Sequence, residues 1–267
     1  MLSYQHIYHA GCLADVHKHA ALAVLLARLT EKPKPLTYME THAGRGAYDL
    51  QAPEAQKTGE AKAGILRLLT DGSVPDTHPY LQAIRATQTR LGTDWYPGSP
   101  MVARSLLRTG DALHLMELHP QEHAALKRMM ARDKAQIHKR DGYEGVLAVS
   151  PPAARRGLVL IDPSYEIKSE YDQVGDFILA LHRKWAEATI LLWYPILKQG
   201  LHKTVARRLE TGGLPDVWRR EVSFRTEAGN TGMQGSGLLM INTPYGVETA
   251  LAGAEEILAP ALVKSAG

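Results

Sequence analysis

The chain has 267 residues, of which 45% are hydrophobic and 22% charged, and its formal net charge is +3. These values are typical of a soluble globular protein with one large domain, or one domain carrying an insert, and they exclude a disordered tail protein, a collagen and a disulfide-stapled miniprotein. Cys12 is the only cysteine, which excludes an internal disulfide and a cysteine-based zinc cluster and favours a cytoplasmic setting.

No apolar run reaches the roughly 18–20 residues of a membrane helix, so no contact with a membrane is expected. The first predicted element is an amphipathic helix over residues 15–29, where apolar side chains recur at steps of three and four. Prolines 33 and 35 end this helix, and a short strand over residues 36–39 follows.

The rest of the chain alternates short apolar runs with helical patterns. Strands are predicted at residues 113–116, 136–138, 158–161 and 190–193, and helices at 121–131, 174–185 and 202–209. This alternation predicts an α/β fold with a largely parallel sheet. Residues 217–224 and 237–241, joined by a loop over 227–235, are predicted to form a C-terminal antiparallel hairpin that closes one edge of the sheet.

Acidic residues follow the predicted strands at Glu40, Glu117, Asp141 and Asp162. The last three are 24 and 21 residues apart, about one strand–helix–strand step, whereas Glu40 and Glu117 are 77 residues apart. We therefore expect an inserted helical subdomain at residues 50–97, with helices at 60–69 and 79–91. Residues 1–49 and 98–267 would form the core.

The loop after the first strand contains Gly44 and Gly46, as in sites where the backbone approaches a ligand. Asp49 stands where a dinucleotide fingerprint has its third glycine, which disfavours NAD. Glu117 is placed to bind ribose hydroxyls and Asp141 an adenine amino group, although each acid could instead cap the following helix. Together they favour an adenosine-containing ligand without a diphosphate.

Asp162, Pro163, Ser164 and Tyr165 follow a buried strand, and this segment resembles the Asp-Pro-Pro-Tyr motif of S-adenosylmethionine-dependent amino-methyltransferases. A carboxylate and a backbone carbonyl that accept both hydrogens of a conjugated amino group prepare it for attack. An aromatic ring stacks on the flipped base. Asp162, Pro163 and Tyr165 would take these roles; the alternative is a strand-ending turn with a core tyrosine.

Over nearly its whole length the chain resembles the bacterial 23S ribosomal RNA adenine-N6 methyltransferase J family. The resemblance rests on MLSY at residues 1–4, HAG at 9–11, ADVHKH at 14–19, THAG at 41–44, YPGSP at 96–100, ELHP at 117–120, DG at 141–142 and RGLVLIDP at 156–163. It implies a Rossmann-like S-adenosylmethionine-dependent core with a small helical insertion. It also implies cofactor contacts from His19, His42, Ser99, Glu117, Asp141 and Gly142, a catalytic Asp162, and contact between Tyr4 and 23S ribosomal RNA. Gly44 of the glycine loop is expected to contact the cofactor as well.

Residue patterns alone leave several roles open. Ser99 could be the N-cap of a helix. Lys18 could be a solvated charge on a helix, or it could contact a phosphate or the cofactor carboxylate. His17 and His19 point in different directions on a helix, so no metal site is expected. Ser164 replaces the second proline usual in the motif, which frees the backbone φ angle.

Three other functions remain open for the protein. It could be a DNA adenine methyltransferase, a methylase of glutamine side chains, or a catalytically weak RNA-binding protein that retains the cofactor pocket. Pairs of adjacent basic residues are scattered along the chain. Exposure to solvent explains them as well as contact with RNA phosphates does. We expect a monomer without an obligate protein partner.

Overall fold

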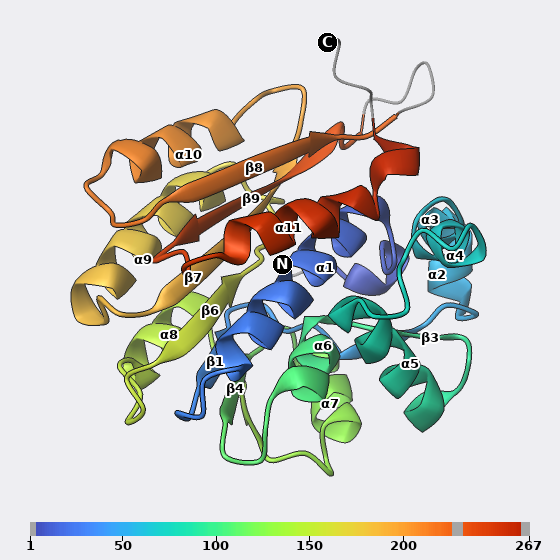
Figure 1. The fold of residues 1–267 in the computed structure, drawn as a ribbon, viewed down its shortest axis with the longest axis horizontal. Coiled ribbons are helices and arrows are strands. Elements are labelled where there is room, and N and C mark those ends of the chain that lie inside the picture. The colour runs from blue at the N-terminus through green and yellow to red at the C-terminus, as the bar shows by residue number, and fades with distance from the viewer. Residues whose placement is uncertain (1–3, 226–231, 263–267) are drawn as a thin grey trace.

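A seven-stranded sheet forms the centre of the computed structural model, which describes residues 4–225 and 232–262 (Figure 1). Its strand order is β5-β4-β1-β6-β7-β9-β8. The strands are β1 (Thr37–Glu40), β4 (Ala112–Met116), β5 (Ala135–His138), β6 (Gly157–Ile161), β7 (Thr189–Ile196), β8 (Trp218–Ser223) and β9 (Gly235–Ile241).

The five strands from β5 to β7 pair in parallel, whereas β9 runs antiparallel to both β7 and β8. These pairings confirm the predicted parallel sheet with a C-terminal hairpin at one edge, and with them the Rossmann-like core. All residues of β1, β6 and β9 are buried, as expected for strands covered by other elements on both faces.

Helices cover both faces of the sheet because right-handed crossovers that move in opposite directions from β1 lie on opposite sides. On the side nearer the viewer in Figure 1, α1 (Leu13–Thr30) packs against α6 (Ser99–Leu106) and α11 (Val247–Glu256). On the other side α9 (Glu170–Lys184) packs against α8 (Gly142–Val149) and α10 (His202–Thr211). The remaining core helix, α7 (Pro120–Met129), follows β4.

The stretch between β1 and α6 is more complex than the two predicted helices. It contains α2 (Pro53–Thr58), α3 (Glu60–Ala63), α4 (Ile65–Thr70) and α5 (Pro79–Leu91). The prediction of one helix over residues 60–69 is wrong: the helix is interrupted at Gly64, whose Cβ, if present, would lie 2.1 Å from the carbonyl oxygen of Gly11. The separation of this stretch from the core as a subdomain stays a prediction.

Two short strands at the base of this stretch were not predicted. Strands β2 (Ala47–Asp49) and β3 (Trp95–Pro97) pair antiparallel and bring its two ends together. Most of the loop predicted at 227–235 lies outside the described residues, and Gly235 already belongs to β9.

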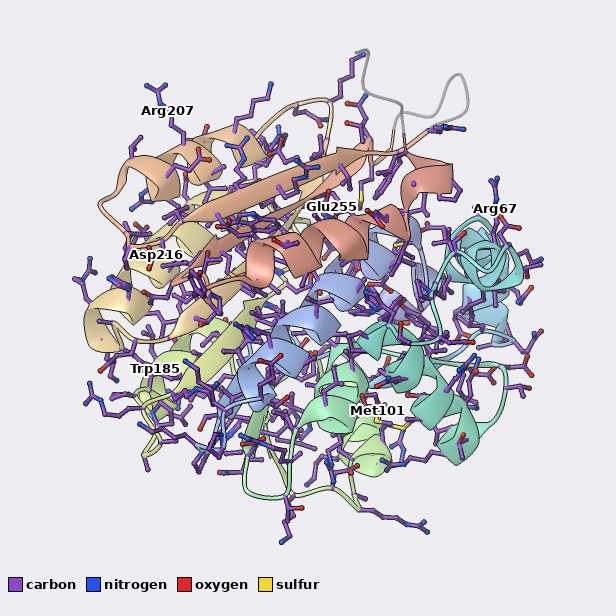
Figure 2. All side chains as sticks on the ribbon, viewed as in Figure 1. Arg67, Met101, Trp185, Arg207, Asp216 and Glu255 are labelled. Atoms are coloured by element: carbon purple, nitrogen blue, oxygen red, sulfur yellow. The ribbon has the colours of Figure 1, made fainter. Side chains whose placement is uncertain are left out.

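Charged side chains such as Arg67 and Arg207 project from the surface around the buried sheet (Figure 2). Within the described ranges, every helix is too short or too polar to span a lipid bilayer.

Candidate active site

A cavity of about 280 Å³ lies at the carboxyl ends of β1, β4 and β6, beside the first turns of α1. This is where open parallel sheets bind their ligands. All but two of the residues predicted for the site line it: Tyr4, Lys18, His19, His42, Gly44, Ser99, Glu117, Asp162, Pro163 and Tyr165. The two that do not are Asp141 and Gly142.

The glycine loop and Glu117 form one wall of the cavity. Gly44 has φ +60°, a left-handed conformation, and a Cβ there would lie 2.5 Å from the Tyr48 hydroxyl. The backbone N–H of Gly44 donates to Glu117 Oε2 at 2.8 Å, and that of His119 donates to Oε1 at 2.7 Å. Burial raises the pKa of the Glu117 carboxyl. Each carboxylate oxygen keeps a lone pair for a ligand hydroxyl.

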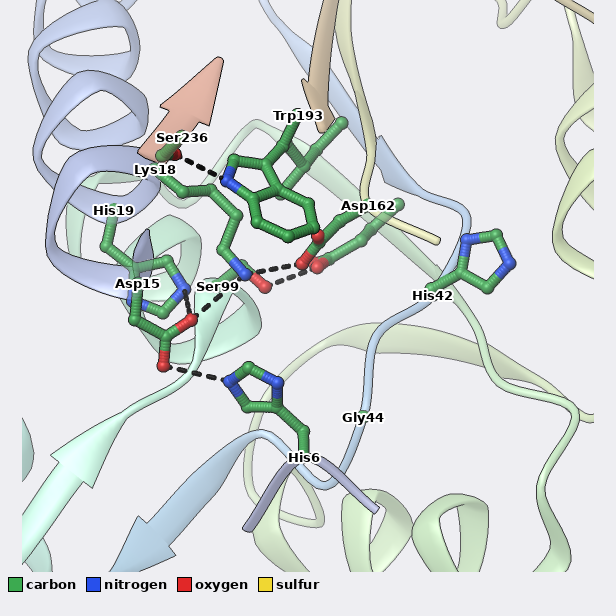
Figure 3. A network of polar contacts seen from close by, with 12 residues as sticks. His6, Asp15, Lys18, His19, His42, Gly44, Ser99, Asp162, Trp193 and Ser236 are labelled. Carbon is green, nitrogen blue, oxygen red and sulfur yellow. Dashed lines mark hydrogen bonds and ion pairs between the residues drawn. The ribbon is translucent and has the colours of Figure 1, made fainter. Parts of the chain in front are cut away.

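Asp162 is held by an ion pair that links the end of β6 to α1 (Figure 3). Lys18 Nζ lies 2.5 Å from Asp162 Oδ2 and 3.1 Å from Asp15 Oδ1. The side chain of Lys18 is only 4% exposed, so its interpretation as a solvated helix charge is wrong. Burial disfavours the ammonium ion, but the charges of Asp162 and Asp15 outweigh it and raise the pKa of Lys18.

The polar network continues from Asp15 to the beginning of the described chain. Asp15 Oδ2 accepts hydrogen bonds from His6 Nε2 at 2.8 Å and from the backbone N–H of Gly11 at 3.0 Å. His6 Nδ1 lies 2.8 Å from the Tyr4 hydroxyl. Burial alone would raise the pKa of Asp15, yet the charge of Lys18 and the interaction with His6 bring it well below its usual value. Tyr4, predicted to meet RNA, is thus connected to Asp162 through three side chains.

An aromatic cluster lies beside the Lys18–Asp162 pair. Tyr165 has φ +54°, an uncommon conformation for an aromatic residue, and its hydroxyl donates to the carbonyl oxygen of Trp193 at 2.9 Å. The ring centroids of Tyr165 and Tyr171 are 4.4 Å apart. Trp193 Nε1 donates to Ser236 Oγ at 2.8 Å, as Figure 3 shows, and Lys18 Nζ lies 5.5 Å from the Trp193 ring. Tyr165 therefore contributes both to the core and to the lining of the cavity.

Ser99 lies at the start of α6, but the interpretation as its N-cap is wrong. Gly98 is the N-cap, and the Ser99 hydroxyl donates to the carboxyl group of Glu40. The hydroxyl of Tyr38 donates to the other oxygen of Glu40 at 3.0 Å. Glu40 is fully buried, and this burial raises its pKa to about 8.

The neighbouring histidines make different contacts. His19 Nδ1 lies 2.8 Å from the Tyr96 hydroxyl, which in turn lies 2.9 Å from that of Tyr80 in α5. His17 contacts Ser236 instead, at 2.9 Å, so the two rings point apart as predicted. Burial lowers the pKa of His19 to about 3 and that of His42 to about 4, which makes both rings neutral at pH 7.

Asp141 and Gly142 begin α8. Asp141 Oδ1 accepts from the backbone N–H groups of Tyr143 and Glu144, both at 3.0 Å, and is therefore a helix cap. At Gly142 a Cβ would lie 2.0 Å from the carbonyl oxygen of Thr41. The close approach of α8 to the end of β1 thus depends on this glycine, while the contact of both residues with a cofactor stays a prediction.

The sequence interpretation missed Asp15, His6 and Glu40. Asp15 lies within the predicted helix, where an acid ordinarily faces solvent, and His6 had no pattern around it. Glu40 was noticed only as the end of a strand. Its position after a short apolar run, like that of Glu117 and Asp162, was a signal that could have placed it at the site.

Comparisons with known proteins identify the family of the chain. The family model described as "Ribosomal RNA large subunit methyltransferase D, RlmJ" matches residues 33–267. The chain is 37% identical to Ribosomal RNA large subunit methyltransferase J of Escherichia coli (strain K12), covering 93% of this chain and 89% of that protein. It is 39% identical to the protein of that name from Haemophilus influenzae, covering 99% and 94%.

Among solved structures, a Legionella pneumophila protein superposes with a TM-score of 0.84 at 36% identity, covering 95% of this chain and 94% of that one. Identity of this degree along nearly the whole chain, together with the match to the family model, shows that the chain belongs to the RlmJ family of large-subunit ribosomal RNA methyltransferases.

Proposed function

We propose that this protein transfers a methyl group from S-adenosylmethionine to N6 of a flipped adenine in 23S ribosomal RNA. The observation that carries the proposal is the position of Asp162 and Pro163, which line the same cavity as the glycine loop and Glu117. A group that activates an amino nitrogen thus lies beside residues suited to an adenosine-containing methyl donor.

The residues present fit S-adenosylmethionine. Gly44 leaves room for close approach of a ligand, Glu117 offers carboxylate oxygens for ribose hydroxyls, and His42 and Ser99 add polar groups to the lining. When bound, S-adenosylmethionine supplies an electrophilic methyl group, so the protein contributes mainly alignment and electrostatics.

Asp162 prepares the nucleophile. Its Oδ2 is fixed by Lys18, which leaves Oδ1 to accept one hydrogen of the adenine amino group. The carbonyl of Pro163 accepts the other, and positive charge that develops on N6 is stabilised by the carboxylate. Tyr165 and Trp193 both line the cavity and provide aromatic faces for the flipped base.

Transfer is direct, without a covalent bond to the enzyme. Cys12 also lines the cavity, but burial raises the pKa of its thiol. The thiolate is the nucleophilic form of cysteine, so Cys12 is unsuited to attack the methyl donor.

Ribosomal RNA is proposed as the substrate because the Escherichia coli and Haemophilus influenzae relatives carry that substrate in their names. The test is transfer of labelled methyl groups from S-adenosylmethionine to 23S ribosomal RNA that lacks the modification. DNA and a glutamine-containing protein serve as alternative acceptors, and digestion of the RNA should release N6-methyladenosine. Label found only in DNA or protein would contradict the proposed substrate.

Asp162→Asn tests the proposed chemistry. The amide keeps the size of the side chain but removes the charge that stabilises N6, so we expect single-turnover methyl transfer to fall at least about a hundredfold, the scale typical of general acid–base groups. S-adenosylmethionine affinity should stay within a few-fold. Asp176→Asn, the same change on the exposed surface of α9, is the control. Transfer by Asp162→Asn at the parental rate would show that Asp162 is not the acceptor.

A further inference from the structure

A second cavity, of about 490 Å³, lies where the end of α5 and strand β3 meet α7. We call it the arginine groove. The residues that line it include Arg45, Arg90, Arg128 and Arg132, together with Trp95 and Met129, and none of the described lining residues is acidic. Four guanidinium groups around one groove form a site suited to an anion, since arginine binds phosphate oxygens in a bidentate manner.

Only part of this positive charge is neutralised. Arg45 forms a bidentate ion pair with Glu122, at 2.9 and 2.5 Å. Arg90 binds Asp133 at 2.9 Å, and that carboxylate is shared with Arg104 at the same distance. Among the described residues, two carboxylates thus form ion pairs with three of these five arginines.

The two remaining arginines, Arg128 and Arg132, are exposed, and among the described residues no carboxylate lies within ion-pair distance of either. Arg128 lies in the last turn of α7, where a cation also interacts favourably with the helix dipole. That effect does not account for Arg132, which lies beyond the helix, nor for the convergence of Arg45 and Arg90 from other elements.

The groove and the catalytic cavity share a wall. Glu122 lines the catalytic cavity, and the arginine it binds, Arg45, lines the groove. Next to Arg45, Gly46 packs closely on α7: a Cβ there would lie 3.1 Å from Leu126 and 3.3 Å from Met129. From Glu122 to Arg128 the helix rises only about 9 Å, so the arginines at the end of α7 lie a short distance along the helix from a residue that lines the cavity.

We propose that the arginine groove binds backbone phosphates of the RNA on one side of the methylated adenine. Arg128 and Arg132 make the phosphate contacts, and Trp95 offers an aromatic face to a neighbouring base. This proposal rests on the proposed function, because it assumes that the polymer entering the catalytic cavity is RNA.

The test compares Arg128→Gln/Arg132→Gln with a control pair, Arg183→Gln/Arg207→Gln. The control removes the same charge from exposed positions on α9 and α10, and Arg207 projects outward from the surface (Figure 2), with α10 well separated from α5 and α7 (Figure 1). The ligand is a 23S ribosomal RNA fragment, and its affinity is measured by fluorescence anisotropy at several salt concentrations. Log affinity falls as log salt rises, and each lost phosphate contact reduces the steepness of that fall by about 1.

For the groove variant we expect a salt dependence less steep by about 2. We also expect KM for RNA to rise about tenfold or more and kcat to stay within about twofold of the parent. Calorimetry should give an unchanged affinity for S-adenosylmethionine, which also shows that the fold is intact. The control should leave slope and KM near the parental values.

Equal slopes and affinities for parent and groove variant, or an equal loss in the control pair, would overturn the groove proposal while leaving RNA methylation intact. A parent protein that binds the RNA through the groove but methylates only DNA or protein would overturn the proposed function instead. An RNA affinity that does not depend on salt concentration would also overturn the groove proposal.

Discussion

Lys18 determines how the side chains around it are arranged. Buried carboxylates are costly unless they are paired, and one ammonium group satisfies both Asp162 and Asp15. The pairing occupies one oxygen of Asp162 and gives His6 a negatively charged partner in Asp15. A residue that looks like an ordinary surface lysine in the sequence therefore positions the carboxylate that we propose to be catalytic.

Glu117→Gln tests the cofactor site at this scale. The change removes a charged acceptor facing the cavity while keeping its size, and hydrogen bonds to charged groups contribute about 1.5–3 kcal/mol. We expect calorimetry to show S-adenosylmethionine affinity reduced roughly ten- to a hundredfold. Glu144→Gln, at an exposed position on α8, should bind the cofactor like the parent. An unchanged affinity of Glu117→Gln, with the fold intact, would remove Glu117 from the site.

At the residue scale, sequence patterns found side chains whose position follows from local structure. Glu117 and Asp162 come directly after apolar strands, and the carboxyl ends of parallel strands meet at one edge of the sheet. Asp15 and His6 acquire their roles only because Lys18 of α1 pairs with Asp162 after the end of β6. Such long-range pairing leaves no periodic signal in the chain.

At the scale of elements, strands β6 and β7 were predictable because strands covered on both faces are short continuous apolar runs. Strands β2 and β3 were missed since three residues each are too few for a pattern. The break at Gly64 was missed for a tertiary reason: the carbonyl of Gly11, far away in sequence, occupies the space of a side chain.

A substitution at Gly142 tests the packing of α8 against β1. In Gly142→Ala the new methyl group would lie 2.0 Å from the carbonyl oxygen of Thr41, so backbone must shift, at a cost of about 1–3 kcal/mol or more. Urea unfolding should show this loss.

The matched control is Gly253→Ala on α11, where a Cβ would meet nothing within 4 Å. Alanine is favoured over glycine within a helix by about 1 kcal/mol, so this variant should be as stable as the parent or slightly more stable. If Gly142→Ala unfolds at the same urea concentration as Gly253→Ala, the close approach of α8 to β1 is not constrained as described.

At the scale of the whole molecule, buried titratable groups make stability depend on pH in opposing ways. Burial lowers the pKa of His17 and His19 to about 3 and that of His42 to about 4. These groups bind protons more readily in the unfolded chain, so they reduce stability as pH falls below about 6.5. Glu40 has the opposite effect, because its pKa is raised by burial.

Glu40→Gln isolates the contribution of that carboxyl group. Its pKa rises from 4.5 to about 8 on folding, so between these values the folded state binds the proton and the unfolded state releases it. The stabilising contribution is complete below pH 4.5 and is lost as pH rises through 8, by at most about 1.4 kcal/mol per pH unit. Glutamine keeps the shape and an acceptor for Ser99 but does not titrate.

We therefore expect the free energy of unfolding of Glu40→Gln to increase relative to that of the parent as pH rises from 5 to 8. The difference between the two should become constant above pH 8. Urea unfolding at each pH measures it, and the histidines cancel because both proteins contain them. A difference that does not vary with pH would show that Glu40 titrates alike in the folded and unfolded chains. Burial of Glu40 would then not raise the pKa of its carboxyl group as described.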